Sequence, residues 1–313
     1  MTRYEIPDEP PETGWDIHCH TVFSDGTETP QGMVSLALRN GLDGIAITDH
    51  DTSAGWDDAA DAAAREGIAL LRGTEITAVC GSVSVHMLGL QYDPANKRIA
   101  DMFSTTRRKR LLRTRHMVER MAQDFPITWQ KVEQQVKEGS RTTVGRPHIA
   151  DALVAAGVYR TRSEAFAGAV SAQSKYYIPT PSPTAREVVE TVKQAGGVVI
   201  IAHPGDRRRN DTLLSDAQIG MLVDAGLDGL EVWHRGNLPD QRRRLLDLAR
   251  KYGLLVTGGA GLGGAGETKG VGGELSAGRT GGRSWGRGVV APLRTDGAVR
   301  AVRARRVSMT LWE

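Results

Sequence analysis

The stretch Asp16-Ile17-His18-Cys19-His20-Thr21-Val22-Phe23-Ser24-Asp25-Gly26 decides the fold class, because a short strand runs into a loop that carries ligand-type side chains. Side chains alternate along a strand, so His18 and His20 are expected on one face and Cys19 on the other. Two imidazoles on one face can hold a metal ion, whereas Cys19 is not expected to supply a thiolate. An isolated His-x-His is more often structural, so its meaning depends on the rest of the chain.

Working outward, short apolar runs alternate with amphipathic stretches, which is the pattern of β/α units. Strands are expected at Trp15–His20, Gly44–Thr48, Ala69–Gly73, Val83–Leu90, Val198–Ala202, Gly229–Trp233 and Leu254–Thr257. Helices are expected at Pro30–Asn40, Ser53–Glu66, Ala185–Ala195, Ser215–Ala225 and Pro239–Tyr252. A glycine that can form a left-handed C-cap follows each helix, at Gly41, Gly67, Gly196, Gly226 and Gly253. Seven strands in this rhythm predict a parallel barrel or a closely wound sheet of the α/β class.

Two segments break the rhythm and divide the chain. Residues 101–184 read as consecutive helices that open with a basic run, Arg107 to Arg115, and close with a proline-marked segment. Residues 261–313 are rich in Gly and Arg and lack periodic burial. We therefore expect a first barrel part at 1–100, a helical insertion at 101–184, a second barrel part at 185–260 and an atypical tail at 261–313.

The bulk properties are those of an ordinary globular protein. The 313 residues include two cysteines and carry a formal net charge of +3, which is a weak hint of anionic partners. Two cysteines do not make a disulfide framework, and the sequence shows neither a secretory signal nor an apolar run that could span a membrane. We expect a cytoplasmic protein without an obligatory protein partner.

Metal-ligand side chains recur at successive strand ends. Six of the eight histidines lie at or near the ends of expected strands: His18, His20, His50, His86, His203 and His234. Asp25, Asp49 and Glu75 take equivalent places. The C-terminal ends of barrel strands build active sites, so these groups are expected to gather on one rim. Nitrogen and oxygen ligands without thiolate suit Mn²⁺, Zn²⁺ or Fe²⁺.

These runs resemble the motifs of the PHP (polymerase and histidinol phosphatase) family. Asp16 to Gly26 resembles its first motif, Ile47-Thr48-Asp49-His50-Asp51 its second, and Ala202-His203-Pro204 a later histidine motif. The resemblance extends from about Gly14 to Gly259 and is strongest to stand-alone phosphoesterases that release phosphate from 3′,5′-bisphosphonucleotides. Some of these also trim short RNA from the 5′ end. The resemblance implies a distorted (β/α)7 barrel with an all-helical insertion that caps the substrate.

The resemblance also implies a cluster of two or three divalent metals. One ion would use His18, His20 and Glu75, a second Glu75, His86 and His203, and a third Asp25 and His50. The catalytic groups would be Asp25, His50, Glu75 and His203. Bridged cations lower the pKa of bound water and neutralise phosphoryl oxygens, so a metal-activated hydroxide would attack without a side-chain nucleophile.

Substrate contacts are expected from the insertion and the sixth strand. Arg146 and His148 resemble an arginine-histidine element that holds substrate phosphate, although a plain helix start would look the same. Lys175 is a weaker phosphate candidate. His234 is a candidate for substrate contact or structural support, and Glu231 would line the same pocket. The basic run is either an RNA-backbone track or a solvated helix face.

The last family motif, Gly-Ser-Asp-x-His, is missing. Gly261 stands where its aspartate is expected and Gly263 where its histidine is expected, so two metal ligands are lost. One interpretation is a weakened PHP module that binds nucleotide or RNA without efficient cleavage. The other is a tail translated from a shifted reading frame in a GC-rich gene. The function predicted is a metal-dependent phosphoesterase acting on phosphorylated nucleotides or short RNA; histidinol phosphate is a less favoured substrate because of the long insertion.

Overall fold

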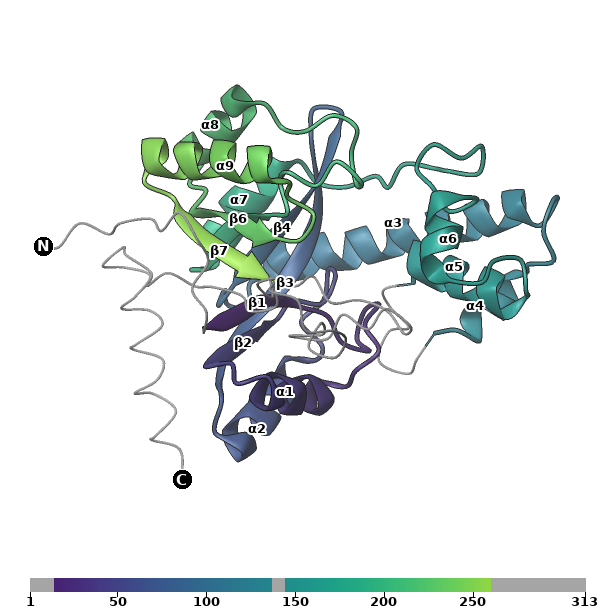
Figure 1. Ribbon diagram of the computed structural model, residues 1–313, viewed down its shortest axis with the longest axis horizontal. Helices are drawn as coiled ribbons and strands as arrows, with labels where there is room; N and C mark the ends of the chain where they lie inside the picture. The colour runs from purple at the N-terminus through teal and green to yellow at the C-terminus, as the bar shows by residue number, and fades with distance from the viewer. Residues whose placement is uncertain (1–13, 137–143, 260–313) are drawn as a thin grey trace, which may run out of the picture.

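The computed structural model describes residues 14–136 and 144–259, which form a nearly closed seven-stranded barrel with helices around it (Figure 1). The strands are β1 Trp15–Cys19, β2 Gly44–Ile47, β3 Ala69–Cys80, β4 Val83–Leu90, β5 Val198–Ala202, β6 Gly229–His234 and β7 Leu255–Gly259. Their order in the sheet follows the chain, and the edge strands β1 and β7 lie side by side. The predicted fold class is confirmed.

The sheet is mixed, so the expectation of an all-parallel barrel is wrong in one place. β1, β2 and β3 pair in parallel, as do β5, β6 and β7, but β4 is antiparallel to both of its neighbours. The reason is that β3 continues past its expected end at Gly73 to Cys80 and turns through Gly81, whose φ of 61° suits glycine. Glu75 therefore lies within β3, and His86 lies in the middle of β4.

Within residues 14–136 and 144–259, five helices pack on the outside of the barrel. They are α1 Pro30–Arg39, α2 Trp56–Glu66, α7 Ala185–Gln194, α8 Asp216–Asp224 and α9 Pro239–Tyr252. Their apolar faces are buried against the outer side of the strands, for example Val189 of α7 with Ile201 of β5. All five glycines expected to follow these helices have positive φ, between 67° and 107°. The helix ends predicted from glycine are thus confirmed.

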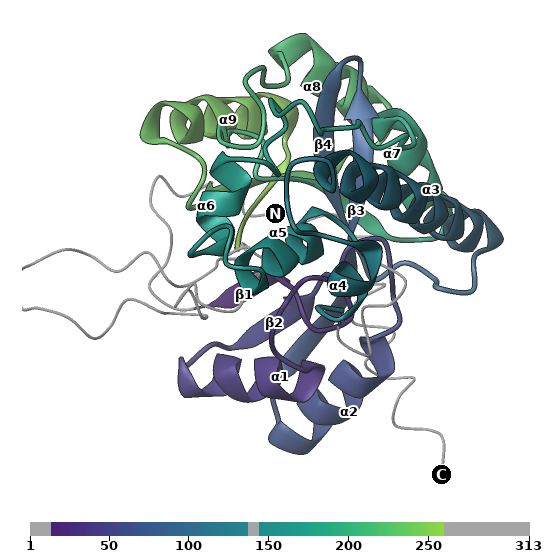
Figure 2. The same cartoon turned by 90° about the vertical axis from the view of Figure 1, so that its right-hand side faces the viewer.

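The insertion forms a separate helical layer beside the barrel. Its described helices are α3 Lys97–Met121, α4 Trp129–Glu133, α5 Arg146–Ala155 and α6 Arg162–Ala167. The long α3 begins in the barrel core, where Phe103 is buried, and ends in the insertion's own core around Met117 and Ile149. Figure 2 shows α4, α5 and α6 in front of the sheet when the molecule is seen from the insertion side. Helix α6 reaches the barrel, because Arg162 lies 3.4 Å from the Asp25 backbone oxygen.

Some sequence predictions fall outside the described residues or are not tested. Gly261, Gly263 and the tail at 261–313 lie beyond the described part of the chain. The division at residues 101 and 184 stays a prediction. Among the described helices, none combines the length and apolar character needed to cross a bilayer.

Candidate metal centre

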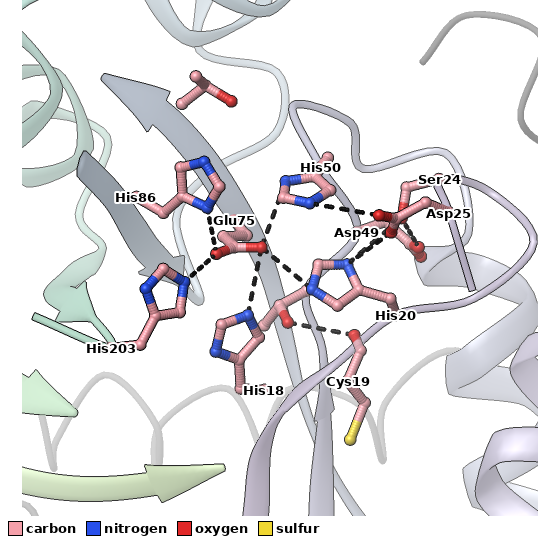
Figure 3. Close-up of polar contacts among 12 residues, drawn as sticks. His18, Cys19, His20, Ser24, Asp25, Asp49, His50, Glu75, His86 and His203 are labelled. Atoms are coloured by element: carbon pink, nitrogen blue, oxygen red, sulfur yellow. Dashed lines mark hydrogen bonds and ion pairs between the residues drawn. The ribbon is translucent and has the colours of Figure 1, made fainter. Parts of the chain in front are cut away.

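Glu75 is the centre of the site, because its carboxylate contacts five imidazoles (Figure 3). Oε2 lies 3.2 Å from His18 Nε2, 3.0 Å from His20 Nε2 and 3.2 Å from His50 Nδ1. Oε1 lies 2.7 Å from His86 Nδ1 and 2.9 Å from His203 Nε2. The side chain of Glu75 is 1% exposed. Residues from five separate segments thus meet around one buried carboxylate.

The alternation expected along the first strand is confirmed. His18 and His20 face the barrel interior and Glu75, whereas Cys19 is buried on the other side with Met33 and Ile45. Burial raises the pKa of the Cys19 thiol well above its ordinary value. Cys19 is therefore a core residue and not a thiolate ligand.

The donor atoms are grouped as a divalent metal would require. In the described part of the chain, three sets have ligand atoms within 4.8 Å of one another: His18/His20/Glu75, His20/Asp25/His50 and His50/Glu75/His86. His18 Nε2, His50 Nδ1 and Glu75 Oε2 are buried and make no hydrogen bond of acceptable geometry, although they are in contact. Buried polar atoms normally have partners, so these orphaned atoms fit a cation placed between them. The residues present fit the metal site that the sequence predicts.

These groups differ in detail from the ligand sets implied by resemblance. The set of His18, His20 and Glu75 is the one expected. His50 stands between Asp25 and Glu75, and its two ring nitrogens face one carboxylate each, Nε2 towards Asp25 at 3.8 Å. His203 contacts Glu75 directly but belongs to none of the three compact sets. Its role as a metal ligand stays a prediction.

The two aspartates of the site do different things. Asp25 Oδ1 lies 3.6 Å from His20 Nδ1. Burial would raise the pKa of Asp25, but the neighbouring His50, His20 and Arg162 side chains outweigh burial and hold that pKa well below its usual range, so the carboxylate is ionised. Asp49 instead accepts hydrogen bonds from Thr21 N, Thr21 Oγ1 and Ser24 Oγ at 2.6–2.7 Å. Asp49 therefore fixes the loop that presents Asp25.

Glu231 has a function that the sequence did not assign. Its Oε1 is 3.0 Å from His18 Nδ1, and its Oε2 accepts a hydrogen bond from the His203 backbone N–H at 2.6 Å. A metal-binding histidine usually donates its second ring N–H to a carboxylate, which fixes its orientation and raises its basicity. Glu231 is thus placed to hold His18 with Nε2 towards Glu75. The pairing joins residues 213 apart in the chain, so local sequence patterns give no sign of it.

The electrostatics divide the histidines into two kinds. Burial alone would lower the pKa of His18, but Glu231 and Glu75 outweigh it and raise the pKa to about 10. For His50, His203 and His234, burial is the largest effect and holds the pKa well below the ordinary value. Burial thus favours the neutral form of these three imidazoles, which has the lone pair that a metal ion or a hydrogen-bond donor requires. His18 must lose a proton before it can bind a cation.

Metal affinity is therefore expected to depend on pH. Because the folded-state pKa of His18 is raised above its unfolded value, its protonation stabilises the metal-free protein below about pH 6.5, and this contribution is lost as pH rises through about 10. Displacing this proton should make Mn²⁺ affinity rise about tenfold per pH unit from roughly pH 7 to 8.5. Competition with a chelator at several pH values measures the slope, and a flat profile would contradict the coupling.

A companion variant tests the carboxylate that causes the shift. Glu231→Gln removes one of the two charges that raise the pKa of His18 and should reduce the pH slope, and it is expected to lower Mn²⁺ affinity by about 10- to 100-fold. Glu164→Gln, on the exposed part of the insertion, serves as the matched control and should bind Mn²⁺ as the wild type does. Wild-type affinity and slope in Glu231→Gln would show that the pairing does not orient His18.

The insertion contributes cationic groups next to the metal centre. Arg162 of α6 pairs with Asp151 and reaches the Asp25 backbone oxygen at 3.4 Å. Arg107 of α3 donates to the Asp51 backbone oxygen at 2.6 Å, and Arg110 pairs with the Asp51 carboxylate. The charge of this run is evident in the sequence but the direction of its side chains is not: Arg107 and Arg110 hold the insertion to the loop after His50.

The predicted substrate residues occupy different positions. The Arg146 guanidinium lies 5.4 Å from the Tyr177 ring and 5.6 Å from the Phe166 ring. His148 is 4% exposed, and its Nδ1 accepts a hydrogen bond from the Gly145 N–H at 3.2 Å. Lys175 is exposed and pairs with Asp124 at 2.8 Å, so its described contacts are within the insertion. His234 is buried beside His203 and His18.

Comparison with known proteins agrees with this geometry. The PHP domain family matches residues 16–91. A crystal structure of a proposed metal-dependent phosphoesterase from Bifidobacterium adolescentis is 64% identical, with a TM-score of 0.80 over 83% of this chain and 93% of that one. The 5′-3′ exoribonuclease Rnm of Salmonella typhimurium is 29% identical over 79% of this chain and 84% of its own length. The 3′,5′-nucleoside bisphosphate phosphatase of Chromobacterium violaceum is 29% identical over 78% and 85%.

The matched family segment contains His18, His20, His50, Glu75 and His86. This chain covers 93% of the Bifidobacterium protein at 64% identity. A metal-dependent phosphoesterase needs a site for divalent cations, and the buried cluster around Glu75 fits such ions. The chain belongs to the PHP family and is a metal-dependent phosphoesterase.

Proposed function

We propose that this phosphoesterase hydrolyses phosphate monoesters of nucleotides, with 3′,5′-bisphosphonucleotides and short RNA 5′ ends as its substrate classes. The main support is that the buried cluster around Glu75 lies next to an insertion that directs Arg162 and Arg107 towards the loops of the site. Arg113 and Arg146 both lie against the Tyr177 ring, at 5.2 and 5.4 Å, and in the described residues neither pairs with a carboxylate. Arg113 is buried and Arg146 partly buried, and such cations without acidic partners favour a ligand that brings its own negative charge.

In this proposal, one group of residues binds the cations at the phosphate that is cleaved, and another group binds the second phosphate. His18, His20, Asp25, His50, Glu75 and His86 would hold two or three divalent cations, and His203 would complete the set from β5. When bound, the cations supply Lewis acidity and a lowered pKa for water. Arg146 would hold the phosphate that is not cleaved, and His148 would support it from the first turn of α5. The described contact of Lys175 is the ion pair with Asp124, which does not support a role in phosphate binding.

Two relatives favour the nucleotide classes over other phosphate esters. Their names state a 3′,5′-nucleoside bisphosphate phosphatase and a 5′-3′ exoribonuclease, and both are similar to this chain over more than three quarters of its length. The alternative, a module that binds such ligands without efficient cleavage, is motivated by Gly261 and Gly263. Turnover separates the two functions.

The direct test is phosphate release from 3′,5′-bisphosphoadenosine by the Mn²⁺-loaded protein, with a 5′-phosphorylated oligoribonucleotide as the second substrate. Asp25→Ala should abolish release, because it removes the ionised carboxylate between His20 and His50. Binding of either ligand without turnover under Mn²⁺, Zn²⁺ and Fe²⁺ would support the alternative. Neither binding nor turnover would remove the nucleotide proposal.

The role of Arg146 gives a specificity prediction. Arg146→Ala should lower kcat/KM for the bisphosphate by about 10- to 100-fold, because a charge-assisted contact to the second phosphate is lost. Hydrolysis of p-nitrophenyl phosphate, which lacks that phosphate, should change less than about threefold. Arg160→Ala removes an exposed arginine of the same insertion and is the matched control. An equal fall for both substrates would mean that Arg146 supports the fold rather than the second phosphate.

A further inference from the structure

His234 ends β6 beside the metal centre, and its ring is held in one orientation by the backbone. The residue is 1% exposed. Its ring centroid lies 5.2 Å from that of His203 and 6.2 Å from that of His18. Nδ1 accepts a hydrogen bond from the Gly236 N–H at 3.0 Å. The turn that follows β6 thus fixes both the direction of the ring and the use of one of its nitrogens.

The Gly236 contact also decides which nitrogen carries the proton. A backbone N–H can only donate, so Nδ1 must offer a lone pair, and in the neutral ring the proton is then on Nε2. Nε2 is buried and has no hydrogen-bond partner within the described chain. A buried donor without a partner costs free energy, which a ligand oxygen in the site would recover. The ring therefore presents a fixed N–H donor beside His18 and His203.

This arrangement excludes one role and favours another. An N–H directs the positive end of its dipole outward, so Nε2 cannot ligate a cation while Nδ1 accepts from Gly236. An oxygen with lone pairs next to the metal centre is the complementary partner. We propose that His234 Nε2–H donates a hydrogen bond to a phosphoryl oxygen of the substrate, as a substrate-contacting residue distinct from the metal ligands. The inference rests on the proposed function and adds a specific contact to it.

The test uses two amides of different length. In His234→Gln the side-chain N–H₂ reaches about as far as Nε2, whereas in His234→Asn it reaches only to the Nδ1 position. His234→Asn should lower kcat/KM for 3′,5′-bisphosphoadenosine by about 10- to 100-fold, as expected for a lost hydrogen bond to a charged group. His234→Gln should stay within about threefold of the wild type. Inorganic phosphate, titrated calorimetrically into the Mn²⁺-loaded proteins, should bind in the same order.

Metal affinity distinguishes a substrate contact by His234 from a role in metal binding. Mn²⁺ affinity, measured by chelator competition, should be the same in both variants and in the wild type. Wild-type kinetics and phosphate affinity in His234→Asn, equal losses in both variants, or a parallel loss of Mn²⁺ affinity would each overturn the inference. If the wild type releases phosphate and His234→Asn is unimpaired, the inference about His234 fails but the proposed function stands. If the wild type neither releases nor binds phosphate, the proposed function and the inference both fail.

Discussion

Replacing Glu75 with glutamine is expected to lower kcat/KM by about a thousandfold or more and to remove tightly bound metal. The carboxylate contacts five imidazoles and is placed to offset the charge of neighbouring cations, which an amide cannot do. Loss of several kcal/mol of transition-state stabilisation corresponds to this factor. Phosphate release and metal content per chain, measured on the same preparation, test the expectation.

The matched control is Glu119→Gln, which makes the same change on the exposed side of α3. Its activity and metal content should equal those of the wild type. If Glu75→Gln retained its metal and lost less than about tenfold in kcat/KM, Glu75 would not be the centre of the site.

Replacing Asp51 with alanine is expected to destabilise the protein by about 3–5 kcal/mol. The Asp51 side chain is fully buried; it pairs with Arg110 and accepts hydrogen bonds from the backbone N–H and hydroxyl of Thr77 at 2.9 and 3.0 Å. Alanine would leave the largely buried Arg110 charge and two donors without partners. Urea unfolding of the metal-free protein measures the loss.

Two further variants make the Asp51 result interpretable. Asp61→Ala removes an exposed carboxylate from α2 and should cost less than about 0.5 kcal/mol. Adding Arg110→Leu to Asp51→Ala should recover part of the stability, because the unpaired charge is then gone. A loss below about 1 kcal/mol in Asp51→Ala would show that the ion pair does not fasten α3 to the barrel.

The sequence predicted most of the fold because each β/α unit is marked locally. An apolar strand of four to eight residues, an amphipathic helix and a closing glycine such as Gly67 or Gly253 are short-range features. The direction of β4 was not predictable in the same way. The β3–β4 hairpin depends on the chain continuing as a strand beyond Gly73, and a run such as Glu75 to Cys80 also fits a loop that follows a strand.

The site was predictable as a set of residues but less so as a geometry. Ligand-type side chains at successive strands identified Glu75 and its histidines, because parallel strands bring equivalent positions together. The residues that orient these ligands could not be predicted from the sequence. Glu231 orients His18 and Arg110 holds Asp51 through tertiary contacts between distant segments, which leave no spacing pattern in the chain. The tautomer of His234 likewise depends on a turn, not on a motif.

The sheet follows the order of the chain, so among the described strands its two edges, β1 and β7, are the first and the last to be synthesised. His18 emerges early, but its carboxylate partner Glu231 follows 213 residues later, and Glu75 waits 128 residues for His203. During synthesis the first strands lack their later partners, and unpaired strand edges of this kind are what chaperones protect. The three compact ligand sets lie within residues 18–86, so the ligands themselves are made early, whereas the orientation of His18 by Glu231 must wait for the later strands.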